Sequence, residues 1–171
     1  MIKLFEDHWS DICQNVTNIA VPIFHIPFNT RLRSEIISTL FEIESAKYYR
    51  KIGIKVKNAL NDSEPDLFFT DLEKPVEIKV TKFRGTPKWM GNKISKKESQ
   101  FVLIVWDEVI TNLYDNKVGL KFYVTTTYLT PDNWSGQDDG YEYHASFLSL
   151  NNIREKVDLV GNVDILKEYY N

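Results

Sequence analysis

One apolar run constrains the fold of this chain more than any other segment. The run Phe101-Val102-Leu103-Ile104-Val105-Trp106 contains no polar residue, whereas a strand with one face in water alternates apolar and polar side chains. A continuous apolar run of this length is typical of a strand that is covered on both faces. We therefore expect a β-sheet that holds this strand in a central position.

Helical spacing appears before and after the predicted sheet. Apolar residues at intervals of three and four predict a first helix from about Phe5 to Ile19. A second helix is expected from about Thr30 to Lys51, with Gly53 just past its end, where a glycine cap belongs. Between them, Val21 to Pro27 contains two prolines and is expected to be an extended connection. Leu148 to Tyr170 is interpreted as one or two further helices.

Strand patterns follow the second helix. Alternating or apolar segments predict strands at Ile54–Lys57, Asp66–Phe69, Val76–Val80 and Val118–Tyr128. The link from Thr70 to Pro75 is short and turn-rich, so the second and third of these strands are expected to form an antiparallel hairpin. The order of elements indicates an α/β fold with a mixed central β-sheet flanked by helices. At 171 residues, we expect one domain spanning residues 1–171.

Composition limits the cellular setting. The single cysteine, Cys13, excludes an internal disulfide and a Cys-rich zinc module, and it fits a reducing compartment. The first residues are acidic where a signal peptide needs an apolar run, and no stretch approaches 18 uninterrupted apolar residues. We therefore expect a cytoplasmic protein that has no membrane partner.

Positive charge is concentrated in one segment although the chain as a whole is acidic. The net charge of −3 argues against a protein that coats nucleic acid by bulk positive charge. Residues 78–97 nevertheless contain no Asp or Glu, and they include seven basic residues: Lys79, Lys82, Arg84, Lys88, Lys93, Lys96 and Lys97. This segregation indicates a local surface for nucleic acid, or else a solvated loop and helix face.

Two short acidic motifs carry the functional signal. Pro65-Asp66 lies at the start of one predicted strand, and Glu77-Ile78-Lys79 lies in the next. Because side chains alternate along a strand, Glu77 and Lys79 project from the same face while Ile78 packs on the other. In the predicted hairpin, Asp66 comes within a few ångströms of Glu77. Two adjacent carboxylates repel each other, which favours a cation between them.

Mg²⁺ is the cation that suits such a pair. It takes oxygen ligands and is typically held by one or two carboxylates together with water and substrate phosphate. Mg²⁺ in turn suits phosphodiester hydrolysis, because it stabilises the charge that develops during displacement at phosphorus. Lys79 can hold the attacking water or offset the charge of the phosphate.

Each residue also has a simpler explanation. Glu77 and Lys79 can form a solvent-facing ion pair on an ordinary sheet, and Asp66 can cap a turn. A Glu-x-Lys triplet recurs by chance, and Asp115-Asn116-Lys117 has a similar form in a predicted turn. The alternating strand and the Pro-Asp partner favour the copy at Glu77.

A third acidic residue is predicted on the second helix. Glu44 lies four residues after Leu40 and four before Tyr48, so it projects from their apolar stripe toward the sheet. A carboxylate there needs a partner, which a metal, a metal-bound water or Lys79 would supply, or a salt bridge at the edge of the stripe. Glu42 is expected to be better solvated, although a shift in helix phase exchanges the two.

These motifs together resemble the core of the PD-(D/E)XK nuclease superfamily. The resemblance covers about residues 35–127: a helix that carries a glutamate, the strand pair with Pro65-Asp66 and Glu77-Ile78-Lys79, a helix around residues 92–98 and the apolar strand. It implies a restriction-endonuclease-like core. The roles that it implies are Mg²⁺ ligation by Asp66, Glu77 and the backbone carbonyl of Ile78, a catalytic Lys79, and an auxiliary acid at Glu44.

Within the superfamily, the small size and the strand from Leu120 to Tyr128 most resemble type II restriction endonucleases. That resemblance implies cleavage of double-stranded DNA at a short sequence by a homodimer, with Mg²⁺ and no small-molecule cofactor. The alternatives are a DNA-repair or Holliday-junction nuclease of the same superfamily, a non-catalytic DNA-binding domain of that fold, and an unrelated α/β protein.

DNA contacts are expected from the basic segment and from polar loops. Basic side chains neutralise phosphates, whereas bidentate groups read base edges. The candidates are Lys82, Arg84, Lys88, Asn92, Lys93, Lys96, Lys97 and Gln137. Trp89 and Trp134 are interpreted either as residues that stack on bases or as residues that pack on their own domain.

Overall fold

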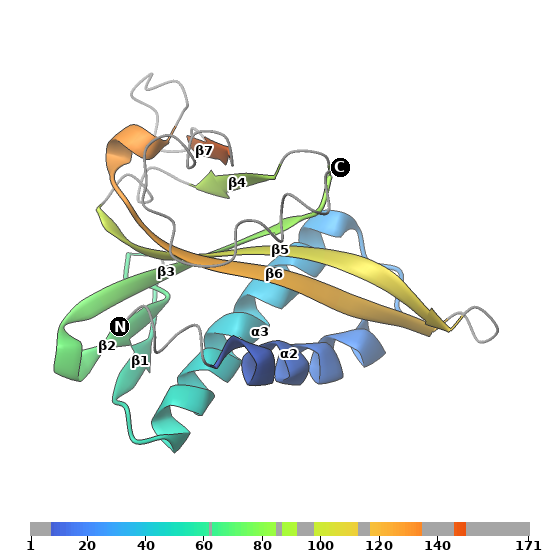
Figure 1. Ribbon diagram of the computed structural model, residues 1–171, viewed down its shortest axis with the longest axis horizontal. Coiled ribbons are helices and arrows are strands. Elements are labelled where there is room, and N and C mark those ends of the chain that lie inside the picture. The colour runs from blue at the N-terminus through green and yellow to red at the C-terminus, as the bar shows by residue number, and fades with distance from the viewer. Residues whose placement is uncertain are drawn as a thin grey trace.

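The computed structural model describes residues 8–61, 63–84, 87–91, 98–112, 117–134 and 146–149 (Figure 1). In these ranges, helices α2 (Trp9–Ile23) and α3 (Thr30–Lys51) lie on one side of a five-stranded sheet. A two-stranded sheet of β4 (Lys88–Gly91) and β7 (Ser146–Ser149) lies on the other side, above the main sheet in Figure 1. The described part is therefore layered, with the main sheet in the middle.

The main sheet is mixed, and its strand order is β1-β2-β3-β5-β6. Its strands are β1 (Val56–Asn58), β2 (Leu67–Phe69), β3 (Lys74–Lys82), β5 (Ser99–Asn112) and β6 (Lys117–Leu129). All neighbours are antiparallel except β3 and β5, which are parallel. The short 3₁₀ helix η1 (Thr70–Leu72) joins β2 to β3, so the predicted hairpin is confirmed. Because β2 is much shorter than β3, its pairing with β3 ends at Val76.

The second helix has the limits that the sequence predicts. The Asn29 side chain accepts a hydrogen bond from the backbone of Leu32 at 2.9 Å and caps the start of α3. Past its end, Gly53 has a φ of +87°, a conformation that favours glycine. The N–H groups of Gly53 and Ile54 donate to carbonyls of the last turn at 3.1 and 2.9 Å. This is the predicted glycine cap.

The first helix extends further than the sequence predicts. We expected the chain to be extended from Val21, but α2 continues to Ile23 with Pro22 in its last turn. A proline at this position removes only one N–H donor near the end of the helix. The N–H of Phe24, the residue after the helix, still donates to the carbonyl of Ala20 at 2.9 Å. The expectation for residues 21–23 was therefore wrong.

The core lies between the two helices and the sheet. Its fully buried side chains from the helices include Ile12, Val16, Ile37 and Phe41, and those from the sheet include Leu67, Val76, Val102, Ile104 and Trp106. Burying each such side chain contributes roughly 1.5–3 kcal/mol. This packing fixes α3 against β3, which positions the residues described below.

The second layer covers the opposite face of β5. Trp89 of β4 is fully buried, and its Nε1 donates to the carbonyl of Ile104 at 3.1 Å. The ring of Trp134 lies against Phe101, with centroids 5.5 Å apart. Both tryptophans therefore pack on their own domain, and stacking on bases is not supported.

The predicted covered strand is confirmed. Every residue from Phe101 to Trp106 is buried, and β5 lies between β3 and β6. The mixed sheet is confirmed as well, although both helices of the described part lie on the same face of it. The helix expected from Leu148 is wrong at its start, because Leu148 and Ser149 belong to β7. Neither described helix is long and apolar enough to cross a membrane.

Candidate functional site

Asp66 and Glu77 lie side by side where β2 begins. The register pairs Leu67 with Val76, so Asp66, the residue before β2, stands opposite Glu77. Burial and then the nearby Asp66 carboxylate raise the pKa of Glu77 above its ordinary value. The two acids are therefore as close as the predicted hairpin requires.

The backbone of Ile78 faces the same edge of β3. Its N–H donates to Asp66 Oδ2 at 2.6 Å. Because the N–H and the C=O of one strand residue point the same way, the Ile78 carbonyl is also directed to this edge. Phe83 lies five residues further along the chain, and its N–H instead donates to the carbonyl of Trp106 in β5 at 2.8 Å. Because N–H groups alternate in direction along a strand, the odd-numbered residues of β3 face β5. The N–H of Ile78, an even-numbered residue, faces the opposite edge of β3.

Lys79 and Glu77 share one face of β3. Lys79 Nζ lies 3.5 Å from Glu77 Oε2, and the two side chains are only 21% and 18% exposed. Lys79 lowers the pKa of Glu77, which offsets part of the effect of burial and Asp66. A solvated surface ion pair would leave both groups in water, so this pair is of a different kind.

A third carboxylate, that of Glu42 on α3, lies near enough to Asp66 and Glu77 for their charges to affect its pKa. Burial and then the Asp66 carboxylate raise the pKa of Glu42 to about 7. Glu77 adds to this rise, while Lys79 and a hydrogen bond from Ser38 oppose it. Ser38 Oγ donates to Glu42 Oε1 at 3.4 Å. Glu42 therefore interacts with all three residues of the predicted motif.

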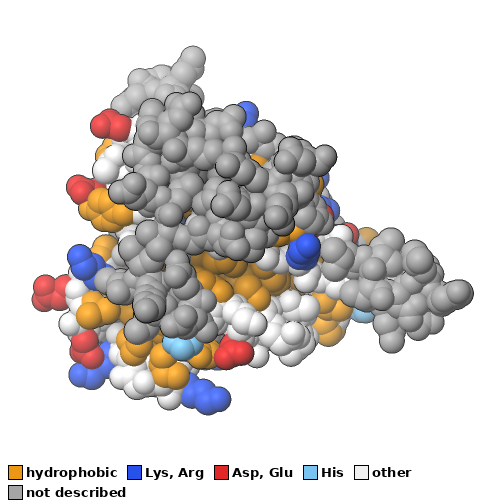
Figure 2. Space-filling view, in the orientation of Figure 1, with side chains coloured by type: hydrophobic (Ala, Val, Ile, Leu, Met, Phe, Trp, Pro, Cys, Tyr) orange, Lys and Arg blue, Asp and Glu red, His pale blue; other side chains and the backbone are white. Residues whose placement is uncertain are grey.

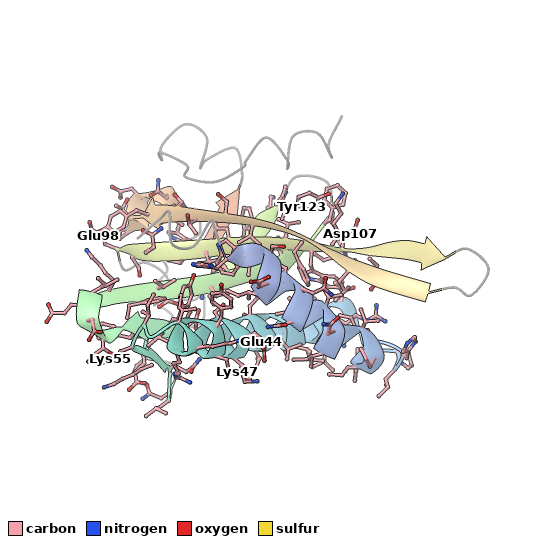
Figure 3. The ribbon with its side chains drawn as sticks, turned by 60° about the horizontal axis from the view of Figure 1, so that its bottom comes forward. Glu44, Lys47, Lys55, Glu98, Asp107 and Tyr123 are labelled. Carbon is pink, nitrogen blue, oxygen red and sulfur yellow. The ribbon has the colours of Figure 1, made fainter. Side chains whose placement is uncertain are left out.

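The prediction that Glu44 joins this cluster is wrong. Glu44 is 7% exposed, but its carboxylate accepts a hydrogen bond from Lys47 Nζ at 2.7 Å, in a pocket that Asp11 and Gln14 of α2 also line. Figure 3 shows Glu44 and Lys47 on α3, beside α2. α2 covers one side of α3 and the sheet covers another. Glu44 is buried, as expected, but it faces α2 and not the sheet.

Two carboxylates and one backbone oxygen meet at the edge of β3. Asp66, Glu77 and the Ile78 carbonyl offer the oxygen donors that Mg²⁺ prefers, and one or two carboxylates are its usual share of protein ligands. In the described ranges, no group of three or more His, Cys, Asp and Glu side chains is arranged to hold a metal ion. Asp66 and Glu77 could hold Mg²⁺ as a two-carboxylate site, with Glu42 as a neighbour.

A groove of about 700 Å³ leads away from the acidic cluster. One wall is the first half of α3, and the other is β3 with the residues that follow it. Its basic lining residues are Arg31, Lys79, Lys82, Arg84 and Lys88, and its acidic lining residues are Glu35 and Asp66. By contrast, Lys or Arg and Asp or Glu side chains are interspersed over the surface around β1 and β2 (Figure 2). Positive charge thus predominates in the groove.

Three of the predicted DNA-binding residues, Lys82, Arg84 and Lys88, line this groove. Lys82 is partly engaged, because its Nζ lies 3.7 Å from Glu108 and 5.0 Å from the ring centroid of Trp106. The remaining five candidates lie outside the described residues: Asn92, Lys93, Lys96, Lys97 and Gln137.

The α3 residues that line the groove were not predicted. Thr30, Ser34 and Ser38 precede Glu42 at intervals of four residues, which places all four on one face of the helix. This polar stripe is the signal in the sequence that indicates both the groove wall and the acid of α3 whose pKa Asp66 affects.

Comparison with known proteins finds no matching family model and no matching curated protein. The function is therefore inferred from the residues and their arrangement.

Proposed function

We propose that this protein is a Mg²⁺-dependent endonuclease of the PD-(D/E)XK type that cuts double-stranded DNA, most similar to a type II restriction endonuclease. The observation that supports this most is the meeting of Asp66, Glu77 and Lys79 at one edge of β3. Adjacent, partly buried carboxylates are unfavourable without a cation. A simple surface ion pair does not account for them.

The residues of the cluster have separate roles in this proposal. Asp66 and Glu77 would hold Mg²⁺, with the Ile78 carbonyl as a third protein oxygen. When bound, Mg²⁺ supplies stabilisation of a phosphoryl oxygen and lowers the pKa of water. Lys79 offsets charge on the scissile phosphate and orients the attacking water through its ammonium protons. Glu42 accepts hydrogen bonds from water beside Asp66 and Glu77 and so fixes its position.

The order of elements supports a restriction-endonuclease-like core. α3 brings an acid to the cluster, the β2–β3 hairpin brings Asp66 and Glu77 together, and the parallel neighbour β5 forms the covered strand. Cutting both strands at one sequence needs two catalytic centres, so the proposed enzyme acts as a homodimer on a two-fold DNA site.

Digestion of a sequenced plasmid tests the proposal. Wild type is incubated with Mg²⁺ or with excess EDTA, alongside Asp66→Asn and Lys79→Met. The matched controls are Asp71→Asn and Lys57→Met, which change exposed residues outside the cluster in the same way. We expect discrete, Mg²⁺-dependent fragments from wild type and both controls, and no fragments from the two site variants.

Other outcomes distinguish the alternatives. Cutting of a four-way DNA junction regardless of sequence, with the plasmid left intact, would assign the site to a repair or Holliday-junction nuclease. Binding of duplex DNA without cleavage of any substrate would indicate a non-catalytic DNA-binding domain. Cleavage by Asp66→Asn equal to that of wild type would remove the basis of the proposal.

A further inference from the structure

The groove has a catalytic end and a far end. At the far end, the guanidinium of Arg84, which follows β3, donates to Oγ1 of Thr30, the first residue of α3, at 2.9 Å. At 1.5 Å per residue, α3 rises about 18 Å from Thr30 to Glu42. β3 covers about 10 Å from Lys79 to its end at Lys82, and Phe83 and Arg84 continue beyond it. The two walls therefore run together well beyond the acidic cluster.

Two hydroxyl groups in the groove, those of Ser34 and Thr30, donate their protons to no acceptor among the described residues. Trp106 Nε1 donates to Ser34 Oγ at 3.0 Å, and Arg84 donates to Thr30 Oγ1. A hydroxyl has one proton and two lone pairs, so each of these oxygens is engaged as an acceptor and keeps its proton. Neither Ser34 nor Thr30 donates to an acceptor in the described part of the chain. Both line the groove, so they present O–H donors to its contents.

Ser38 differs from these two residues. It also lines the groove, but its hydroxyl proton is donated to Glu42 at 3.4 Å. The change from free donors to an engaged one occurs where the acidic cluster begins. The far part of the groove is therefore the part suited to an anion.

The charged residues in the far part of the groove also favour an anion. Within the described residues, neither Arg84 nor Lys88 has a carboxylate partner, whereas Arg31 is paired with the exposed Glu35 at 2.9 Å. Lysine, arginine and hydroxyl protons are all donors, and charge-assisted bonds to phosphate oxygens are the strong ones among them. A row of such donors fits a row of phosphates.

We infer that this groove is a track for the phosphates of one DNA strand next to the phosphate that is cut. The hydroxyls of Thr30 and Ser34, oriented by Arg84 and Trp106, bind phosphate oxygens together with Arg84 and Lys88. The inference rests on the proposed function, because the scissile phosphate is taken to lie at Asp66 and Lys79. The track continues from that phosphate in one direction along the strand.

Binding measurements over a range of salt concentrations test the track without cleavage. Wild type in EDTA binds a fluorescein-labelled duplex of mixed sequence, followed by anisotropy. Arg84→Gln is compared with Lys57→Gln, an exposed lysine of β1. We expect Arg84→Gln to weaken binding and to reduce the slope of log K against log salt by about one, because one phosphate contact releases about one counterion. Lys57→Gln should bind like wild type.

The hydroxyl donors are tested in the same assay. Ser34→Ala should weaken binding about five- to tenfold with the salt slope unchanged, because a neutral donor releases no counterion. The control is Thr39→Ala, since the exposed Thr39 hydroxyl donates to a carbonyl of its own helix at 3.0 Å. Ser34→Ala removes the acceptor of Trp106 Nε1, so thermal unfolding is measured too. Thr30→Val, at the start of α3, tests the same point if that variant does not fold.

The outcomes separate the track from the nuclease. Equal salt slopes for Arg84→Gln and Lys57→Gln would overturn the track, as would equal affinities for folded Ser34→Ala and Thr39→Ala. If these variants lose binding as expected and wild type never cuts DNA with Mg²⁺, the groove stands as a phosphate track and the nuclease proposal falls. If wild type cuts and the variants bind normally, only the track falls.

Discussion

The Asp66 carboxylate accepts a hydrogen bond from the backbone N–H of Ile78 at 2.6 Å. This contact links the start of β2 to the edge of β3 and keeps the carboxylate beside Glu77. It also identifies the side to which the Ile78 carbonyl points. Asp66 therefore has a structural role in addition to the proposed binding of a metal.

Asp66→Asn and Asp66→Ala separate these two roles. Asn retains an oxygen that can accept from Ile78 and removes a charge from beside Glu77, so the metal-free variant should be at least as stable as wild type. Ala leaves the Ile78 N–H without its acceptor and should cost about 1 kcal/mol or more. Both variants should lose the rise in melting temperature that Mg²⁺ produces by binding the folded state. Thermal unfolding in EDTA and in Mg²⁺ measures both effects. A full Mg²⁺-dependent rise in Asp66→Ala would argue against this metal site.

Glu42→Gln and Glu44→Gln distinguish the two acids of α3. Glu42 interacts with Asp66, whereas Glu44 is paired with Lys47 beside α2. We expect Glu42→Gln to slow Mg²⁺-dependent DNA cleavage at least tenfold, because water at the site loses a charged acceptor. Glu44→Gln should stay within about twofold of wild type, since it contacts neither substrate nor metal ligand in this proposal. Initial cleavage rates at saturating Mg²⁺ measure both effects. A larger loss of rate in Glu44→Gln than in Glu42→Gln would show that Glu44 belongs to the site.

The pH dependence of stability follows from the raised pKa of Glu42. Burial and then Asp66 raise this pKa from 4.5 to about 7. A raised pKa in the folded state contributes stability below pH 4.5, and this stability is lost as the pH rises toward 7. Because Gln does not ionise, the stability advantage of Glu42→Gln over wild type should grow across that window and level off above pH 7. After allowance for partial exposure, we expect a difference of about 1–2 kcal/mol. Urea unfolding in EDTA at several pH values measures it, and a constant difference would contradict this environment for Glu42.

The parts of the fold that local sequence determines were predicted correctly. The limits of α3 depend on its cap at Asn29 and on Gly53, and both signals lie within a few residues of the helix ends. The opposition of Asp66 and Glu77 depends on a short link between two strands, which leaves the chain little freedom. The extended conformation predicted from Val21 was wrong because Pro22 lies in the last turn of α2, where it removes one N–H donor near the end of the helix.

The remaining features depend on contacts between distant segments. Glu42 and Glu44 are separated by about 200° around the helix axis, and both sides of α3 are covered, so apolar spacing could not show which side faces the sheet. The contacts of Ser34 with Trp106 and of Thr30 with Arg84 join residues 72 and 54 positions apart. No rule of sequence spacing predicts a contact between such distant residues. They meet only because α3 packs against the sheet.

The thiol of Cys13 should be unreactive in the folded protein. Burial raises its pKa to about 12, so almost no thiolate is present at pH 8. We expect slow reaction with a thiol reagent such as DTNB under native conditions and rapid reaction after unfolding in guanidinium chloride. Absorbance at both conditions gives the ratio of the rates. Rapid native labelling at pH 8 would contradict the packing of this partly buried side chain of α2 against the core.

Glu108 links the stability of the sheet to the charge of the groove. Its carboxylate is paired with Arg33 and lies 3.7 Å from Lys82 Nζ, and all three side chains are no more than 30% exposed. Glu108→Gln leaves two partly buried cations without their anion, so it should destabilise the protein by about 1–3 kcal/mol. Glu35→Gln, which removes an exposed partner of Arg31, should cost less than about 0.5 kcal/mol.

The same change should strengthen DNA binding although it weakens the fold. Lys82 lines the groove, and without Glu108 its full positive charge faces the contents of the groove. We expect Glu108→Gln to bind a mixed-sequence duplex more tightly than wild type and to increase the salt slope by up to about one, because one more phosphate contact becomes available. Urea unfolding and anisotropy on the same preparation measure both quantities. A loss of stability without a gain in affinity would mean that Lys82 is a structural cation and not part of the DNA-binding surface.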